Sequence, residues 1–125
     1  MAALAVAVLL AEAMVRWWIP ISNVRYYYNS QTGTTLAPSS RMRWVSAGSY
    51  DNIVETNSLG FHDKEHKWKK KTTAFRIIAL GDSYLEGLQV PVASLFSQKL
   101  EKRLEDSHGH EMVEVINLGL SGRGP

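Results

Sequence analysis

The sequence contains no cysteine among its 125 residues. A chain without cysteine cannot form a disulfide framework, a thiolate nucleophile or a cysteine-rich zinc site. The absence excludes these classes of protein but does not fix the cellular compartment.

The chain also has little excess charge of either sign. Its formal net charge is +2 at pH 7, from 14 basic and 12 acidic residues. The lysines gather mainly in one run from Lys64 to Lys71, and a solvated linker explains such a run more simply than a nucleic-acid surface does. We therefore expect no nucleic-acid partner.

The N-terminal segment, residues 1–19, is almost wholly apolar and is interrupted by Glu12 and Arg16. As a helix it would be roughly 28 Å long, close to the hydrocarbon thickness of a bilayer. Trp17 and Trp18 suit the headgroup zone at the end of such a helix. We expect a transmembrane anchor in a single-pass membrane protein, with a signal segment or a buried helix as alternatives. Because no lysine or arginine precedes the segment, its orientation stays open.

Residues 20–73 show no sustained helical period and are punctuated by glycine, proline and paired serines. We expect an irregular connecting region with short extended pieces at 24–28 and 41–45. A substrate-facing surface is one role for its aromatic side chains, but an irregular lid or a membrane-proximal contact would use the same residues and is the simpler interpretation. These aromatic residues are Tyr26, Tyr27, Tyr28 and Trp44.

Asp63 and His66 form a D-x-x-H pattern, in which an aspartate can orient a histidine that acts as general base. The pair lies in a lysine-rich stretch before the first expected core strand, which favours a surface loop over a catalytic pair. We expect all four histidines to be surface residues. The other three are His62, His108 and His110.

Residues 74–125 have the pattern of an α/β unit. Residues 75–80 are a short apolar run before Gly81, typical of a strand that is buried on both faces of a parallel sheet. Ser94 is a plausible N-cap for an amphipathic helix that ends near Gly109. Residues 113–118 then predict a second strand, and strand, helix and strand together predict a right-handed βαβ crossover.

The expected chemistry lies where these strands end, because ligands of such sheets bind beyond the carboxyl ends of the strands. Ser83 follows the first strand within three residues, and a serine hydroxyl is a nucleophile that needs a base. Gly122 follows the second strand and would let the main chain approach a substrate closely. The backbone N–H groups of Ser83 and Gly122 are candidates to stabilise an oxyanion.

Two blocks of sequence resemble those of the SGNH (GDSL-like) hydrolase family. Residues 75–84 resemble the first conserved block, in which the serine of G-D-S is the nucleophile, and residues 117–122 resemble the second, whose glycine donates to the oxyanion hole. Residues 57–61 and the apolar N-terminal segment are similar to the corresponding parts of membrane-anchored members.

This resemblance implies that Ser83 is the nucleophile and an oxyanion donor, and that Gly122 is a second donor, with Gly119 as a less favoured alternative. It implies a flavodoxin-like three-layer α/β/α sandwich and a serine esterase that uses no metal or cofactor. The expected substrate is an ester-containing small molecule, a lipid or an acylated polysaccharide, and the expected place of the hydrolase domain is outside the cytoplasm.

The sequence departs from the family in two ways. Nothing in it matches the third block, G-x-N-D, and the family's catalytic D-x-x-H is expected far downstream. We therefore expect residues 74–125 to be the start of a truncated hydrolase domain that is inactive by itself.

Three other interpretations stay open at this point. One is an enzyme related to polysaccharide O-acetyltransferases, and another is a non-catalytic, membrane-tethered protein of a cell-surface assembly. The glycines at 119, 122 and 124 also allow a nucleotide binder, but their order matches neither G-x-G-x-x-G nor the P-loop pattern.

Overall fold

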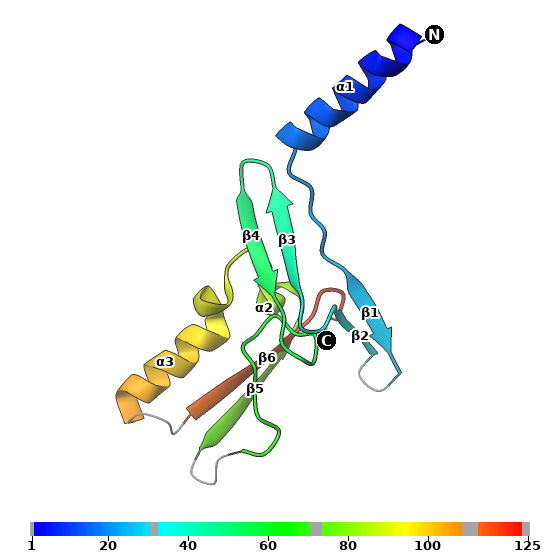
Figure 1. The fold of residues 1–125 in the computed structure, drawn as a ribbon. Helices are drawn as coiled ribbons and strands as arrows, with labels where there is room; N and C mark the ends of the chain where they lie inside the picture. Colours follow the sequence, from blue (N-terminus) through cyan, green and yellow to red (C-terminus); the bar gives the residue numbers. More distant parts are fainter. Residues whose placement is uncertain (1, 31–32, 71–73, 109–112, 124–125) are drawn as a thin grey trace.

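The computed structural model describes residues 2–30, 33–70, 74–108 and 113–123 (Figure 1). The elements in chain order are α1 (Ala2–Trp18), β1 (Tyr26–Asn29), β2 (Gly33–Leu36), β3 (Arg41–Ser46), β4 (Tyr50–Glu55), β5 (Phe75–Gly81), α2 (Ser83–Glu86), the 3-10 turn η1 (Val92–Ser94), α3 (Phe96–His108) and β6 (Val113–Gly119). The strands form three two-stranded sheets: β1 with β2, β3 with β4, and β5 with β6. The first two sheets are antiparallel hairpins, and the third is parallel.

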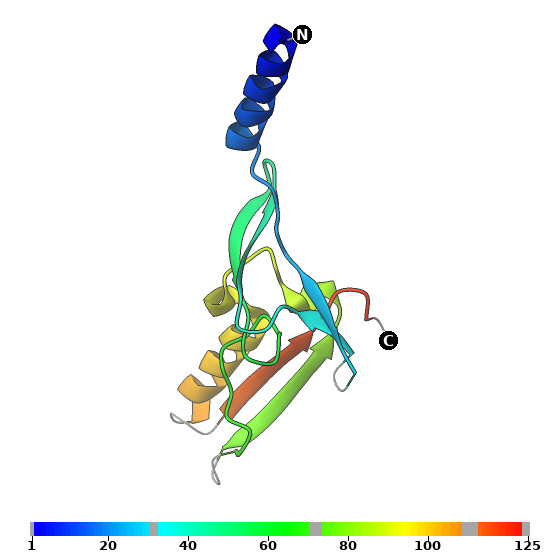
Figure 2. The same ribbon diagram turned by 45° about the vertical axis from the view of Figure 1, so that its right-hand side comes forward.

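Helix α1 extends away from the rest of the chain, and none of its residues is buried (Figures 1 and 2). It contains an ion pair between Arg16 and Glu12, 2.7 Å apart. Within the described ranges, no helix is both long and apolar enough to cross a membrane. The expected transmembrane anchor over residues 1–19, and with it the single-pass membrane localisation, is therefore wrong. The helix has 17 residues, which reach about 26 Å, short of a hydrocarbon core of about 30 Å.

Residues 20–73, where we expected an irregular region with short extended pieces at 24–28 and 41–45, contain the two hairpins β1–β2 and β3–β4. Side chains alternate between the faces of a strand, so Met42 on β3 and its register partner Val54 on β4 point to the same side. Both are buried in the main hydrophobic cluster of the described residues. Its members are Leu36, Ala37, Met42, Val54 and Leu88, with Val24 and Trp44 packed against them.

A tight turn around Gly60 joins the hairpins to the parallel sheet. Gly60 has φ +80, and a Cβ there would lie 2.4 Å from the carbonyl oxygen of Leu36. The Asn57 side chain accepts hydrogen bonds from the N–H groups of Leu59 and Phe61, at 3.1 and 3.0 Å. Two residues after the turn, His62 and Asp63, are buried, and Asp63 accepts a hydrogen bond from the Asn117 N–H on β6.

The expected strand, helix and strand of residues 74–125 are confirmed as β5, α3 and β6. The two strands are parallel and in register from Phe75 opposite Val113 to Gly81 opposite Gly119. Helix α3 begins at Phe96, two residues after the expected Ser94 cap, because Ser94 ends the preceding 3-10 turn. The expected helix end at Gly109 lies outside the described residues.

The expected flavodoxin-like three-layer sandwich is wrong. The parallel sheet has two strands, and α3 packs on one side of it (Figure 2). On the other side Ile78 and Leu80 are 56% and 76% exposed, beside their register partners Ile116 and Leu118. The apolar run of β5 indicated a strand covered on both faces. The described residues supply a helical layer to one face only.

Candidate active site

The turn after Gly81 and the turn after Gly119 lie side by side at the carboxyl ends of the two strands of the parallel sheet. Because β5 and β6 are parallel and Gly81 pairs with Gly119, both strands end side by side. The Leu120 N–H donates to the Gly81 carbonyl at 3.0 Å, which joins the chain after β6 to the end of β5. The expected nucleophile Ser83 and the expected oxyanion donor Gly122 therefore follow adjacent strand ends, and both are exposed.

The first turn presents Ser83 at the start of the single-turn helix α2. Asp82 is the N-cap, and its side chain accepts a hydrogen bond from the Tyr84 N–H at 3.0 Å. Gly87 ends the helix with φ 62, and its N–H donates to the Ser83 carbonyl. A cap at each end thus holds the Ser83 backbone while its side chain faces solvent.

The second turn is packed directly against this helix. A Cβ on Gly119 would lie 2.3 Å from the backbone nitrogen of Glu86, so only glycine fits there. The Gly119 N–H donates to the Asn117 side chain at 2.9 Å and is buried. Gly122 instead has φ +80 and open space around it. Of the two glycines, Gly122 has the main chain that is accessible to a substrate.

Asn117, near the carboxyl end of β6, stabilises this end of the sheet, and the sequence analysis did not identify it. It is 1% exposed and lies on the buried side of β6. Its side-chain amide donates to the Leu85 carbonyl at 2.9 Å and to the His62 carbonyl at 3.3 Å. One side chain therefore joins β6, helix α2 and the chain before β5.

Glu86 is the second residue that the sequence reasoning missed. It is completely buried, and its carboxylate accepts hydrogen bonds from the Tyr26 hydroxyl at 3.3 Å and from the Ser121 N–H at 3.1 Å. The Ser121 hydroxyl also donates to it. Burial raises the pKa of Glu86, and the hydrogen bonds from Ser121 and Tyr26 oppose that rise.

His62 is completely buried, so its expected surface position is wrong. Its Nδ1 lies 3.0 Å from the Glu86 carbonyl oxygen. Because a carbonyl oxygen only accepts, Nδ1 carries the proton. Burial lowers the pKa of His62, which favours the neutral ring. The buried Nε2 makes no hydrogen bond in the structure.

His66 is also not a surface residue, since its side chain is 7% exposed. Its Nε2 lies 2.8 Å from Asp63 Oδ2, and its Nδ1 lies 2.8 Å from Glu114 Oε1. Both ring nitrogens face carboxylates, and only the imidazolium form has two N–H donors. The hydrogen bond with Asp63 accordingly raises the pKa of His66, and the one with Glu114 adds to it. The side chains of His108 and His110 lie outside the described residues.

Asp63 is the centre of this buried polar cluster and is 3% exposed. Besides His66, it accepts hydrogen bonds from the Asn117 N–H at 2.7 Å, the Gln98 side chain at 2.8 Å and the Lys64 N–H at 2.9 Å. The D-x-x-H pattern is therefore a structural ion pair that ties the chain before β5 to β6 and α3.

The position of His66 also separates it from Ser83. Its partner Glu114 precedes Gly119 by five residues on β6, which is about 16 Å along the strand. His66 thus lies toward the amino ends of the strands, and Ser83 lies beyond their carboxyl ends. A general base must reach its proton donor within a hydrogen bond or through one water. Both ring nitrogens of His66 are already held by carboxylates, so neither is free to take a proton from Ser83.

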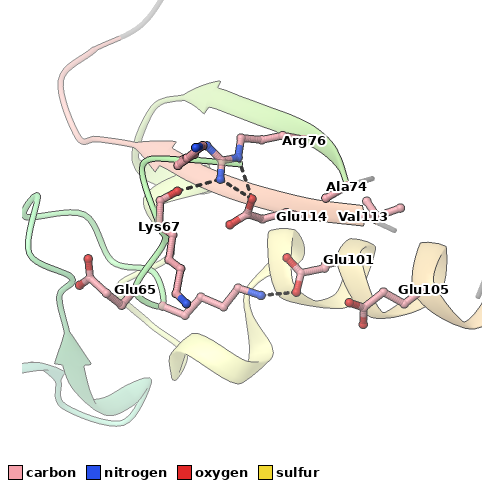
Figure 3. A pocket seen from close by; sticks show the side chains of 10 residues that line it. Glu65, Lys67, Ala74, Arg76, Glu101, Glu105, Val113 and Glu114 are labelled. Carbon is pink, nitrogen blue, oxygen red and sulfur yellow. Dashed lines mark hydrogen bonds and ion pairs between the residues drawn. The ribbon is translucent and has the colours of Figure 1, made fainter. Parts of the chain in front are cut away.

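The amino ends of the strands border an open hollow of about 390 Å³ (Figure 3). On one side of it Arg76 donates to its register partner Glu114 at 2.7 Å and to the Lys67 carbonyl at 2.8 Å, and Lys64 pairs with Glu101. Acidic and basic side chains therefore neutralise each other around the hollow. It is at the end of the sheet opposite Ser83, so it does not belong to the candidate site.

The charged state of His66 makes stability depend on pH. The stabilisation is fully present below about pH 6.5, the ordinary histidine pKa, and is lost as pH rises through the higher pKa of the folded state. We expect wild type to lose stability relative to His66→Gln, whose amide does not titrate, as the pH rises above about 6.5. Urea denaturation at a series of pH values measures this difference. A difference that stays constant over the range would show that His66 is neutral between Asp63 and Glu114.

Comparison of the chain with family models, with curated proteins and with solved structures gives no match. In the described part of the chain there is also no group of three or more histidine, aspartate or glutamate side chains that could hold a metal ion. The case for a site therefore rests on the geometry at the carboxyl ends of β5 and β6.

Proposed function

We propose that this chain carries the nucleophile and the oxyanion donors of a serine ester hydrolase. The observation that supports the proposal best is the in-register pairing of β5 and β6. Because of this pairing, the segments that contain Ser83 and Gly122 both follow the carboxyl ends of adjacent strands, and both residues are exposed. The resemblance of residues 75–84 and 117–122 to the first two blocks of SGNH hydrolases supports the same roles.

In the proposed reaction the Ser83 hydroxyl oxygen attacks the carbonyl carbon of an ester. The hydroxyl proton passes to a base, and the carbonyl oxygen becomes an oxyanion that accepts hydrogen bonds from the backbone N–H groups of Ser83 and Gly122. The oxyanion then collapses and the alcohol leaves with a proton. Water hydrolyses the resulting acyl-serine, which releases the acid and restores the hydroxyl.

The base is a residue other than His62 or His66. The Nε2 of His62, the nitrogen that could accept a proton, is buried and makes no hydrogen bond, whereas Ser83 is exposed. Both ring nitrogens of His66 are held by carboxylates, those of Asp63 and Glu114. In the proposed enzyme the base therefore approaches Ser83 from its exposed side. An acyltransferase would share the acyl-serine and differ in the acceptor, which would be a sugar hydroxyl in place of water.

A fluorophosphonate probe tests the proposal, because it phosphonylates serines that an enzyme activates. The protein is expressed from the complete reading frame that contains this sequence, and the labelled peptide is identified by mass spectrometry. We expect labelling at Ser83, slowed by an excess of a small ester and absent in Ser83→Ala. Ser94→Ala is the matched control and should label like wild type. A folded protein that does not react, or that reacts at another residue, would contradict the proposal.

A further inference from the structure

Glu86 occupies an unusual position for a carboxylate. It is the last residue of α2, three residues after Ser83, and its side chain is completely buried. Burying a carboxylate costs free energy unless hydrogen bonds compensate it. The function proposed above assigns Glu86 no role, yet the residue lies between the two turns that carry Ser83 and Gly122.

The three donors to Glu86 come from both sides of the candidate site. Two belong to Ser121, through its N–H and its hydroxyl, and Ser121 directly precedes Gly122. The third is the hydroxyl of Tyr26 on β1, from the hairpin that lies beside the C-terminal end of the described chain in both ribbon views (Figures 1 and 2). A single side chain therefore connects the nucleophile helix, the turn at Gly122 and the β1–β2 hairpin.

The contacts between the second turn and α2 become fewer toward Gly122, although the turn itself is closed by a hydrogen bond from the Arg123 N–H to the Leu120 carbonyl at 3.2 Å. Gly119 touches the backbone of α2 directly, and the Leu120 N–H is bonded to Gly81. Ser121 is exposed, and its bonds to α2 are the two that it makes with Glu86. Glu86 is thus the last point at which the nucleophile helix fixes this turn before Gly122.

We propose that Glu86 is a positioning residue of the hydrolase site, which holds the Gly122 N–H at the distance from Ser83 that an oxyanion requires. The proposal rests on the function proposed above. An oxyanion donor acts over a narrow range of distances, and a displacement of about 1 Å can cost about a hundredfold in rate. The carboxylate therefore affects the transition state without touching the substrate.

The test compares steady-state hydrolysis of p-nitrophenyl acetate by the complete gene product and by Glu86→Gln, whose amide loses the negative charge that the Ser121 donors bind. We expect kcat to fall about ten- to a hundredfold with KM within about twofold of wild type, because the lost interaction acts in the transition state. The matched control is Glu101→Gln. Glu101 is also a buried glutamate, and it accepts the Val115 N–H at 2.8 Å near the other end of β6. Its replacement should lower stability and leave kcat unchanged.

A second variant keeps the test decisive if Glu86→Gln does not fold. Ser121→Ala removes only the hydroxyl donor of an exposed residue, and it should lower kcat in the same direction by a smaller factor. In the double variant the two effects should not add, because both act through one contact. Additive effects, or kcat falling equally in Glu101→Gln, would overturn the role of Glu86.

The outcome also separates this inference from the proposed function. If Ser83→Ala is inactive while Glu86→Gln and Ser121→Ala keep the wild-type kcat, the hydrolase proposal stands and the positioning role of Glu86 is wrong. If Ser83→Ala hydrolyses the ester as fast as wild type, both are wrong.

Discussion

Replacement of Ser83 by alanine is expected to lower kcat for ester hydrolysis at least about 10³-fold, because the attacking oxygen is removed. KM should change little, since the side chain is exposed and a hydroxyl adds little ground-state binding. The fold should be unaffected. The start of α2 depends on the Asp82 cap and its end on Gly87, and neither contact uses the Ser83 side chain.

The measurement is steady-state hydrolysis of p-nitrophenyl acetate by the complete gene product. Ser107→Ala is a suitable control, because Ser107 is an exposed helical serine whose hydroxyl donates to the Arg103 carbonyl at 2.8 Å, within its own helix. Its kcat should equal that of wild type. If Ser83→Ala retained more than about a tenth of the wild-type kcat, another group would have to be the nucleophile.

Replacement of Asp63 by alanine is expected to lower the free energy of unfolding by about 3–5 kcal/mol, the usual cost of removing one partner of a buried ion pair. The change leaves the Asn117 N–H and the Gln98 amide without their acceptor and removes one carboxylate from His66. Unsatisfied buried donors add their own desolvation penalty. This cluster joins the chain before β5 to β6 and α3, so its loss should destabilise the packing of β5, α3 and β6 together.

Urea denaturation of the wild type and the variant measures this effect. Asp51→Ala is the matched control, because Asp51 is also an aspartate paired with a cation, Arg43, but at an exposed site on the β3–β4 hairpin. Exposed pairs contribute little to stability, so this variant should remain close to wild type. Equal losses in the two variants would show that the contacts of Asp63 in the interior do not stabilise the fold.

The unit formed by β5, α3 and β6 could be predicted from the sequence, because the patterns that indicate each element lie within a few residues of one another. The apolar runs of β5 and β6 and the four-residue spacing in α3 are visible within windows of a few residues. The structure has these elements within about two residues of the predicted positions at the boundaries that it describes. The hairpins gave weaker signals, since their strands have four to six residues. On β4 one of the two buried positions is polar: Asn52 donates to the Leu88 and Val90 carbonyls.

The buried charges could not be predicted because their partners are distant in sequence. Asp63 meets Gln98 and Asn117, 35 and 54 residues away, and His66 meets Glu114, 48 residues away. Without these partners a lysine-rich D-x-x-H segment has the composition of a solvated loop. The burial of Glu86 was also not predictable, because a one-turn helix has no hydrophobic period that marks its buried face.

The membrane anchor was expected for a different reason. Residues 1–19 have the composition of a spanning helix, and composition alone does not show where the helix ends. In the structure α1 stops at Trp18 and pairs Glu12 with Arg16 on its exposed surface. Among the described helices, none combines the length and the apolarity that a membrane span needs.

The most direct test of the proposed chemistry is to identify the residue that carries the acyl group during turnover. The complete gene product is mixed with p-nitrophenyl acetate, quenched with acid within the first turnover, digested and analysed by peptide mass spectrometry. A hydrolase of the proposed kind will carry an acetyl group on Ser83. Hydrolysis of the ester with the acetyl group on another residue, or with no acylated peptide under conditions that trap such intermediates, would contradict Ser83 as the nucleophile.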